Sequence, residues 1–175
     1  IRDLNELFPE EIQNHVVTGS FEQGQTMIGD KIYAFPIFSS AHNTFMLYYN
    51  KDLLENLGIE QKVPRTWSEL IEISKEVYEK SEGKSYGLLI GMKAGWLISD
   101  ATLQMARSIT PETGMNWKTG EYDYATQGLI ETVKFYKTML DENAMSIQSL
   151  ELGAQDVYTQ FANGHSAFMI AGNYV

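Results

Sequence analysis

The chain has 175 residues, of which 43% are hydrophobic and 12% aromatic, so it can bury a core and is not a disordered chain. Its formal net charge of −10 would repel phosphate backbones and anionic lipid head groups, which argues against nucleic acid as a partner. It contains no cysteine, which excludes disulfides and thiolate metal sites within these residues. The sequence starts without methionine and stops directly after an apolar run, so we expect it to be part of a longer chain.

The first third of the sequence predicts short elements joined by loops. An acidic, weakly helical segment covers residues 3–17, with Pro9 favouring a helix start. Residues 31–37 (KIYAFPI) alternate as a short strand. The polar residues 39–43 (SSAHN) indicate a loop or a crossing segment, and a second strand follows over residues 44–49.

Two helices with clear end signals come next. Asn50 can cap a helix that Gly58 ends in the left-handed conformation. Thr66, with Glu69 three residues later, is typical of a capping box at the start of a longer helix. Residues 86–91 (YGLLIG) then predict a buried strand.

The second half alternates helices with strands. Apolar spacing predicts helices over residues 96–109 and 129–140 and a shorter one over residues 157–161. Residues 117–124 indicate a hairpin or turn around a glycine, and residues 166–171 form the last apolar strand. Because the strands are too apolar to face water, we expect an α/β fold with a sheet covered by helices on both faces.

No catalytic constellation stands out. The histidines at positions 15, 42 and 165 lack the spacing of a helical zinc site, and we expect no metal and no cofactor. Residues 83–85 (GKS) fail as a phosphate loop, and residues 164–166 (GHS) fail as a nucleophile elbow. The paired carboxylates lie in polar stretches without the buried surroundings that separate an acid from a base. We therefore expect no enzyme activity.

Two aromatic residues follow predicted strands directly. Trp96 comes after the strand at residues 86–91, and Tyr174 comes after the strand at residues 166–171. Ligands of open α/β sheets bind outside the carboxyl ends of the strands. Either ring could stack on the apolar face of a sugar there, and packing against the protein is an equal alternative for each.

Four motifs in order carry a resemblance to a known family. KIYAFPI, FMLYYNKDLLENLGI, VPRTWSELIEISK and FANGHSAFMIAGN resemble the extracellular solute-binding proteins of ABC transporters. The likeness is to the carbohydrate-binding family 1, the maltose-binding-protein-like group, and it covers residues 30–174. The resemblance implies one lobe of a type II periplasmic-binding-protein-like fold with a mixed sheet. Residues 1–43 would hold the end of lobe one and the first hinge crossing, and residues 44–175 most of lobe two.

The resemblance also implies a ligand site. Asn173 stands where the family often has proline, and Tyr174 where it often has tryptophan, so the identity of the sugar stays open. The ligand-binding residues expected from the matched positions are Ser39, Ser40, His42, Asn43, Trp96, Asn173 and Tyr174.

The function implied is that of a non-enzymatic substrate-binding component of an ABC importer. It would bind a sugar or oligosaccharide by closure of two lobes about a hinge and deliver it to the permease. The expected location is the periplasm or the extracellular face of the cytoplasmic membrane, with membrane association only through a lipid anchor outside these residues. The alternatives are a non-sugar solute on the same fold or, with less support, a lobe of a glycan-active hydrolase.

Overall fold

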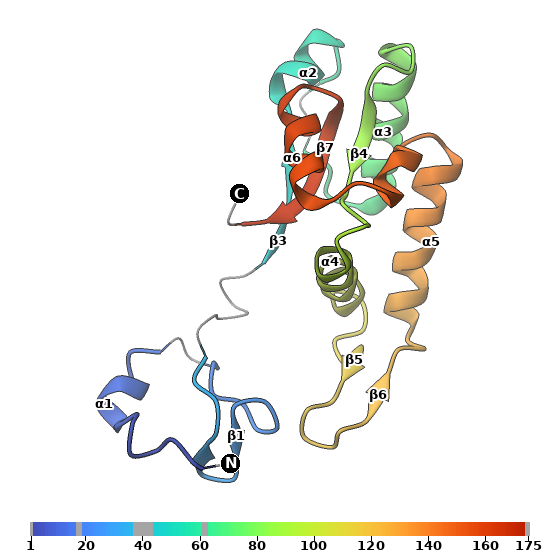
Figure 1. The fold of residues 1–175 in the computed structure, drawn as a ribbon. Helices are drawn as coiled ribbons and strands as arrows, with labels where there is room; N and C mark the ends of the chain where they lie inside the picture. The colour runs from blue at the N-terminus through green and yellow to red at the C-terminus, as the bar shows by residue number, and fades with distance from the viewer. Residues whose placement is uncertain (1, 17–18, 37–43, 61–62, 174–175) are drawn as a thin grey trace.

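The computed structural model describes residues 2–16, 19–36, 44–60 and 63–173 (Figure 1). No helix in these ranges is both long and apolar enough to span a bilayer. The elements in chain order are α1 (Glu10–Gln13), β1 (Met27–Ile28), β2 (Lys31–Ile32), β3 (Phe45–Tyr49), α2 (Lys51–Asn56), α3 (Trp67–Lys80), β4 (Tyr86–Leu89), α4 (Gly95–Arg107), β5 (Gly114–Met115), β6 (Tyr122–Asp123), α5 (Gln127–Asp141), the 3-10 helix η1 (Ile147–Leu150), α6 (Ala154–Ala162) and β7 (Ser166–Gly172).

The central sheet has the strand order β3-β7-β4 and is mixed. β7 runs parallel to β4, with Tyr86 opposite Ser166, and antiparallel to β3, with Phe45 opposite Gly172. All seven residues of β7 are buried, as expected for a middle strand covered on both faces. The predicted α/β class with a mixed sheet is confirmed.

Helices cover both faces of this sheet (Figure 1). Because side chains alternate along a strand, Phe168 of β7 joins the core under α3, α4 and α5, whereas Met169 joins a smaller core with Val157 of α6. Val77 of α3 and Met139 of α5 are fully buried in the larger core. Burying each such side chain contributes about 1.5–3 kcal/mol relative to leaving it in water.

The helix starts follow the predicted capping residues. The Asn50 side chain accepts a hydrogen bond from the Leu53 N–H, and the Thr66 hydroxyl accepts one from the Glu69 N–H. The Glu69 carboxylate in turn accepts the Arg65 N–H at 2.7 Å, one residue before the capping threonine.

The N-terminal segment, residues 2–36, differs from the prediction. The prediction of a strand over residues 31–37 is wrong for residues 33–36, because β2 has two residues and pairs with β1, while residue 37 lies outside the described residues. After Ile32 the chain leaves the strand, and the Phe35 ring stacks on Phe8 with ring centroids 4.1 Å apart. The weakly helical segment predicted for residues 3–17 forms only the four-residue α1, which follows Pro9.

Replacing Gly87 by alanine should lower the free energy of unfolding by about 1–3 kcal/mol. A Cβ at this position of β4 would overlap both the side chain and the Cα of Ser74 on α3, so the helix and strand would have to separate. Gly95→Ala is the matched control, because a Cβ there meets no atom within 4 Å. Urea unfolding compares the two variants, and equal midpoints would contradict the close packing of α3 on β4.

Candidate functional site

Three chain segments meet at one edge of the sheet. β4 and β7 are parallel, so their carboxyl ends lie at the same edge, and β3 begins there because Phe45 pairs with Gly172. Polar or aromatic side chains that follow β4 and β7 are therefore brought together without any need for a long loop. We call this part of the molecule the ligand edge.

The segment after β4 is held in place by the loop before α6. The Met92 N–H donates to the Ser149 carbonyl at 3.0 Å, and the Lys93 N–H donates to the Leu152 carbonyl at 3.2 Å. A Cβ on Gly91 would lie 3.1 Å from the carbonyl group of Gly153, so glycine allows a close approach of the two backbones. These contacts define the path of the chain into α4.

Trp96 lies in the first turn of α4, directly beyond this anchored segment. Its neighbour Leu97 is fully buried and fixes the helix on the core, whereas Trp96 itself is 53% exposed. Trp96 is therefore not buried in the core of the described residues, and its role in stacking or packing stays a prediction. An indole is a large, flat and mainly apolar ring with one polar N–H group.

Asn173 follows β7 at the ligand edge. Its N–H donates to the Thr44 carbonyl at 3.0 Å, and the residue is exposed. The structure thus brings two of the predicted site residues, Trp96 and Asn173, to the same edge of the sheet. The other predicted site residues lie outside the described part of the chain: Ser39, Ser40, His42, Asn43 and Tyr174.

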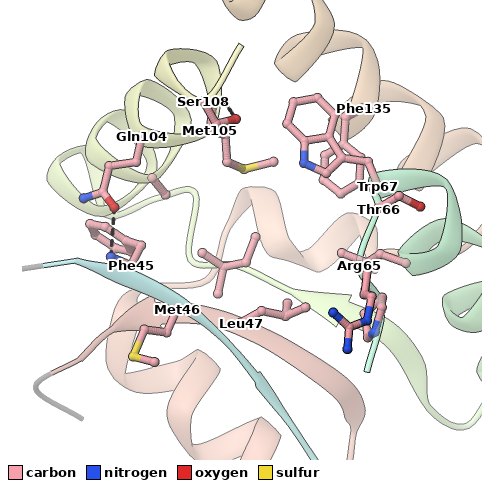
Figure 2. A pocket seen from close by; sticks show the side chains of 14 residues that line it. Phe45, Met46, Leu47, Arg65, Thr66, Trp67, Gln104, Met105, Ser108 and Phe135 are labelled. Carbon is pink, nitrogen blue, oxygen red and sulfur yellow. Dashed lines mark hydrogen bonds between the residues drawn. The ribbon is translucent and has the colours of Figure 1, made fainter. Parts of the chain in front are cut away.

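Gln104 of α4 is a positioning residue that the sequence analysis missed. Its side-chain oxygen accepts a hydrogen bond from the Phe45 N–H at 3.0 Å, which ties the start of β3 to the helix that carries Trp96 (Figure 2). The Tyr48 hydroxyl donates to the Gly172 carbonyl at 3.1 Å and joins β3 to the end of β7. Two hydrogen bonds thus fix where the chain enters the central sheet.

A cavity of about 330 Å³ opens beside the first residues of β3 (Figure 2). It lies between β3, the start of α3 and the middle of α4. Trp67 packs on Phe135 at one wall, with ring centroids 5.2 Å apart, while Arg65, Gln104 and Ser108 supply polar groups. Its lining is mainly apolar, and Trp96 is not part of it.

α5 packs against α4 through a buried tyrosine. The Thr102 hydroxyl donates to the Tyr136 hydroxyl oxygen at 3.4 Å, and Tyr136 donates to the Met105 sulfur at 3.4 Å. Burial raises the pKa of Tyr136 above its usual value, so this hydroxyl stays protonated at neutral pH and acts as a structural contact. Within the ranges that the structure describes, no three His, Asp or Glu side chains gather in a way that could hold a metal ion.

Gln104→Ala should lower the free energy of unfolding by about 1–3 kcal/mol, because it leaves the Phe45 N–H without its acceptor at a partly buried position. Gln104→Glu keeps a side-chain oxygen and should restore most of the loss. Chemical denaturation of the three proteins measures the difference. If alanine and glutamate behave alike, the hydrogen bond does not fix the entry of the chain.

Comparisons with known proteins agree with the fold described above. The family model described as bacterial extracellular solute-binding protein matches residues 3–175. A protein of Brucella abortus (strain 2308) that is named as a binding protein is 28% identical over 150 residues, which cover 86% of this chain.

Two solved structures show the same fold. A chitin oligosaccharide binding protein superposes with a TM-score of 0.70 at 21% identity over 98% of this chain. The maltose-bound MalE3 protein of T. maritima superposes with a TM-score of 0.67 at 23% identity over 99% of it.

The chain spans less than half of each of these proteins. It covers 34% of the Brucella protein, 40% of the chitin oligosaccharide binding protein and 42% of the T. maritima protein. The fold is that of a type II periplasmic binding protein, and the family model extends over nearly all 175 residues. The chain belongs to the bacterial extracellular solute-binding protein family.

Proposed function

We propose that this chain is part of the substrate-binding component of an ABC importer that binds a sugar or an oligosaccharide. The observation that carries the proposal is the exposed Trp96 at an edge of the sheet that also presents Asn173. A flat indole and a neutral amide at the same edge of the sheet suit a ligand with apolar C–H faces and many hydroxyls. Two solved proteins of the same fold are named for, or contain, such ligands.

The binding mechanism is closure of two lobes. Residues 1–43 contribute the end of lobe one and the first crossing, and residues 44–175 contribute most of lobe two. A ligand that contacts both lobes favours the closed arrangement by its difference in affinity for the two states. The hydrogen bond from Phe45 to Gln104 supports this division, because it fixes the start of lobe two next to the ligand edge.

The remaining ligand contacts are assigned to the crossing and to the end of β7. Ser39, Ser40, His42 and Asn43 would donate and accept hydrogen bonds, and Tyr174 would stack. Loss of one buried hydrogen-bonding partner costs about 1–3 kcal/mol, which corresponds to roughly one to two decades of affinity.

The protein would act outside the cytoplasm and without catalysis. Its place is the periplasm or the extracellular face of the cytoplasmic membrane, where the closed form delivers its ligand to the permease. Any lipid anchor would belong to chain outside these residues. The function needs no cofactor, because closure is driven by ligand contacts alone.

Trp96→Ala should weaken saccharide binding about 10- to 100-fold in the full-length protein, because removing a ring stacked on the ligand costs on the order of 1–3 kcal/mol. Trp96→Phe keeps a flat ring and should retain most of the affinity. Isothermal titration calorimetry with maltose, maltooligosaccharides and chitin oligosaccharides measures both variants against the wild type.

The outcomes separate two kinds of failure. Wild-type protein that gives no heat and no thermal shift with any saccharide contradicts the proposed function. Full affinity in Trp96→Ala, with normal binding by the wild type, contradicts only the role of the ring.

A further inference from the structure

Lys93 lies at the ligand edge, between the end of β4 and the first turn of α4. The register of the parallel strands pairs Leu89 of β4 with Met169 of β7. Lys93 and Asn173 each stand four residues after their member of this pair, and Trp96 follows Lys93 by three residues. The fold therefore brings a cationic side chain to the edge of the sheet that also presents the exposed indole.

The backbone of Lys93 is held in place, whereas the residue itself is exposed. Its N–H donates to the Leu152 carbonyl at 3.2 Å, and the N–H of Met92 donates to the Ser149 carbonyl at 3.0 Å. Both hydrogen bonds join main-chain atoms, so a substitution of the Lys93 side chain leaves them intact. The ammonium group is thus carried by an anchored stretch of chain, as a group that selects a ligand should be.

The ammonium group of Lys93 has no acidic partner among the described residues. Most lysines in the same part of the chain do pair with a carboxylate. These are Lys31, Lys51, Lys75, Lys80, Lys84, Lys134 and Lys137. Because the chain contains 23 acidic and 13 basic residues, a lysine that stays without such a partner is the exception.

The elements next to Lys93 do not offset its charge. The first turn of α4 contains no acidic residue. The Asp156 carboxylate accepts the Gly153 N–H at 3.0 Å and so caps α6. Asp100 and Glu151 are exposed, and neither forms an ion pair with Lys93 in the described structure. The ligand edge therefore offers a positive charge to an incoming anion.

Lobe closure would change the surroundings of this charge. Lys93 is exposed, so water can solvate its ammonium group. A ligand held between two lobes covers the ligand edge and removes much of that water. Burial of a charge without a counter-charge is costly, and the hydroxyls of a neutral sugar do not cancel it. An anionic group on the ligand would cancel it and would form a charge-assisted hydrogen bond.

We propose that the ligand is an anionic saccharide, whose charged group binds Lys93 while an apolar sugar face lies against Trp96. The inference rests on the proposed saccharide-binding function and narrows its ligand class. The charge can come from a carboxylate or from a sulfate ester, because a lysine ammonium group acts as a point charge toward either. The net charge of −10 repels anions at long range, but salt screens it over about 8 Å, so the local ammonium group decides the preference.

Isothermal titration calorimetry of the full-length protein tests the ligand class with matched saccharides. Trigalacturonate and its fully methyl-esterified form share one sugar skeleton and differ in charge. A carrageenan tetrasaccharide carries sulfate without carboxylate, and it separates the two sources of charge. Maltotriose and chitotriose are the neutral references. The wild type should bind at least one of the two anionic saccharides more tightly than the methyl ester and both neutral references.

Lys93→Gln removes the charge and keeps a polar side chain. It should weaken binding of the preferred anionic saccharide about 10- to 100-fold, because a covered charge pair loses one partner. Lys93→Arg keeps the charge and should retain most of the affinity. Lys118→Gln is the matched control, because Lys118 is exposed in the turn between β5 and β6 and also forms no ion pair with a described residue. This control makes the same change in net charge and should bind like the wild type.

The outcomes separate the inference from the function on which it rests. If the wild type binds a neutral saccharide more tightly than both anionic ones, the inference is overturned and the proposed function stands. Full anionic affinity in Lys93→Gln, or an equal loss in Lys118→Gln, also overturns the inference. A wild type that binds no saccharide of either kind contradicts both. The comparison of saccharides on the wild type decides the ligand class even if a variant fails to fold.

Discussion

The parallel pairing of β4 with β7 is the constraint on which the rest of the structure depends. It places the carboxyl ends of two strands at one edge, and the antiparallel β3 brings the incoming chain to the same place. Every feature of the candidate site follows from that register. A slip of one residue would turn the buried side chains of β7 toward the opposite face and would shift Asn173 relative to the end of β4.

α4 connects this local arrangement to more distant parts of the chain. Its first turn presents Trp96, its later turns hold the start of β3 through Gln104, and its end anchors the β5–β6 hairpin through Arg107. One helix therefore connects the ligand edge, the entry of the chain and the β5–β6 hairpin. The proposed closure of two lobes would move each lobe as a rigid body.

Features set by neighbouring residues could be predicted from the sequence, and features set by distant contacts could not. The caps at Asn50 and Thr66 were predicted because a capping side chain bonds to a backbone N–H three residues away. The early end of the strand at Ile32 was missed because it depends on the packing of Phe35 against Phe8. The hydrogen bond from the Phe45 N–H to Gln104 joins residues 59 positions apart, so no local pattern predicts it. At the ligand edge, the position of Trp96 after a strand and the resemblance predicted it as a ligand contact, and the structure shows the residue exposed there.

A crystal structure of the full-length protein with a bound saccharide tests the central claim most directly. The account predicts a sugar ring stacked on the Trp96 indole, with Asn173 beside it and protein groups from both lobes around it. A saccharide bound instead in the cavity beside Phe45 and Trp67, or held by one lobe alone, would contradict it.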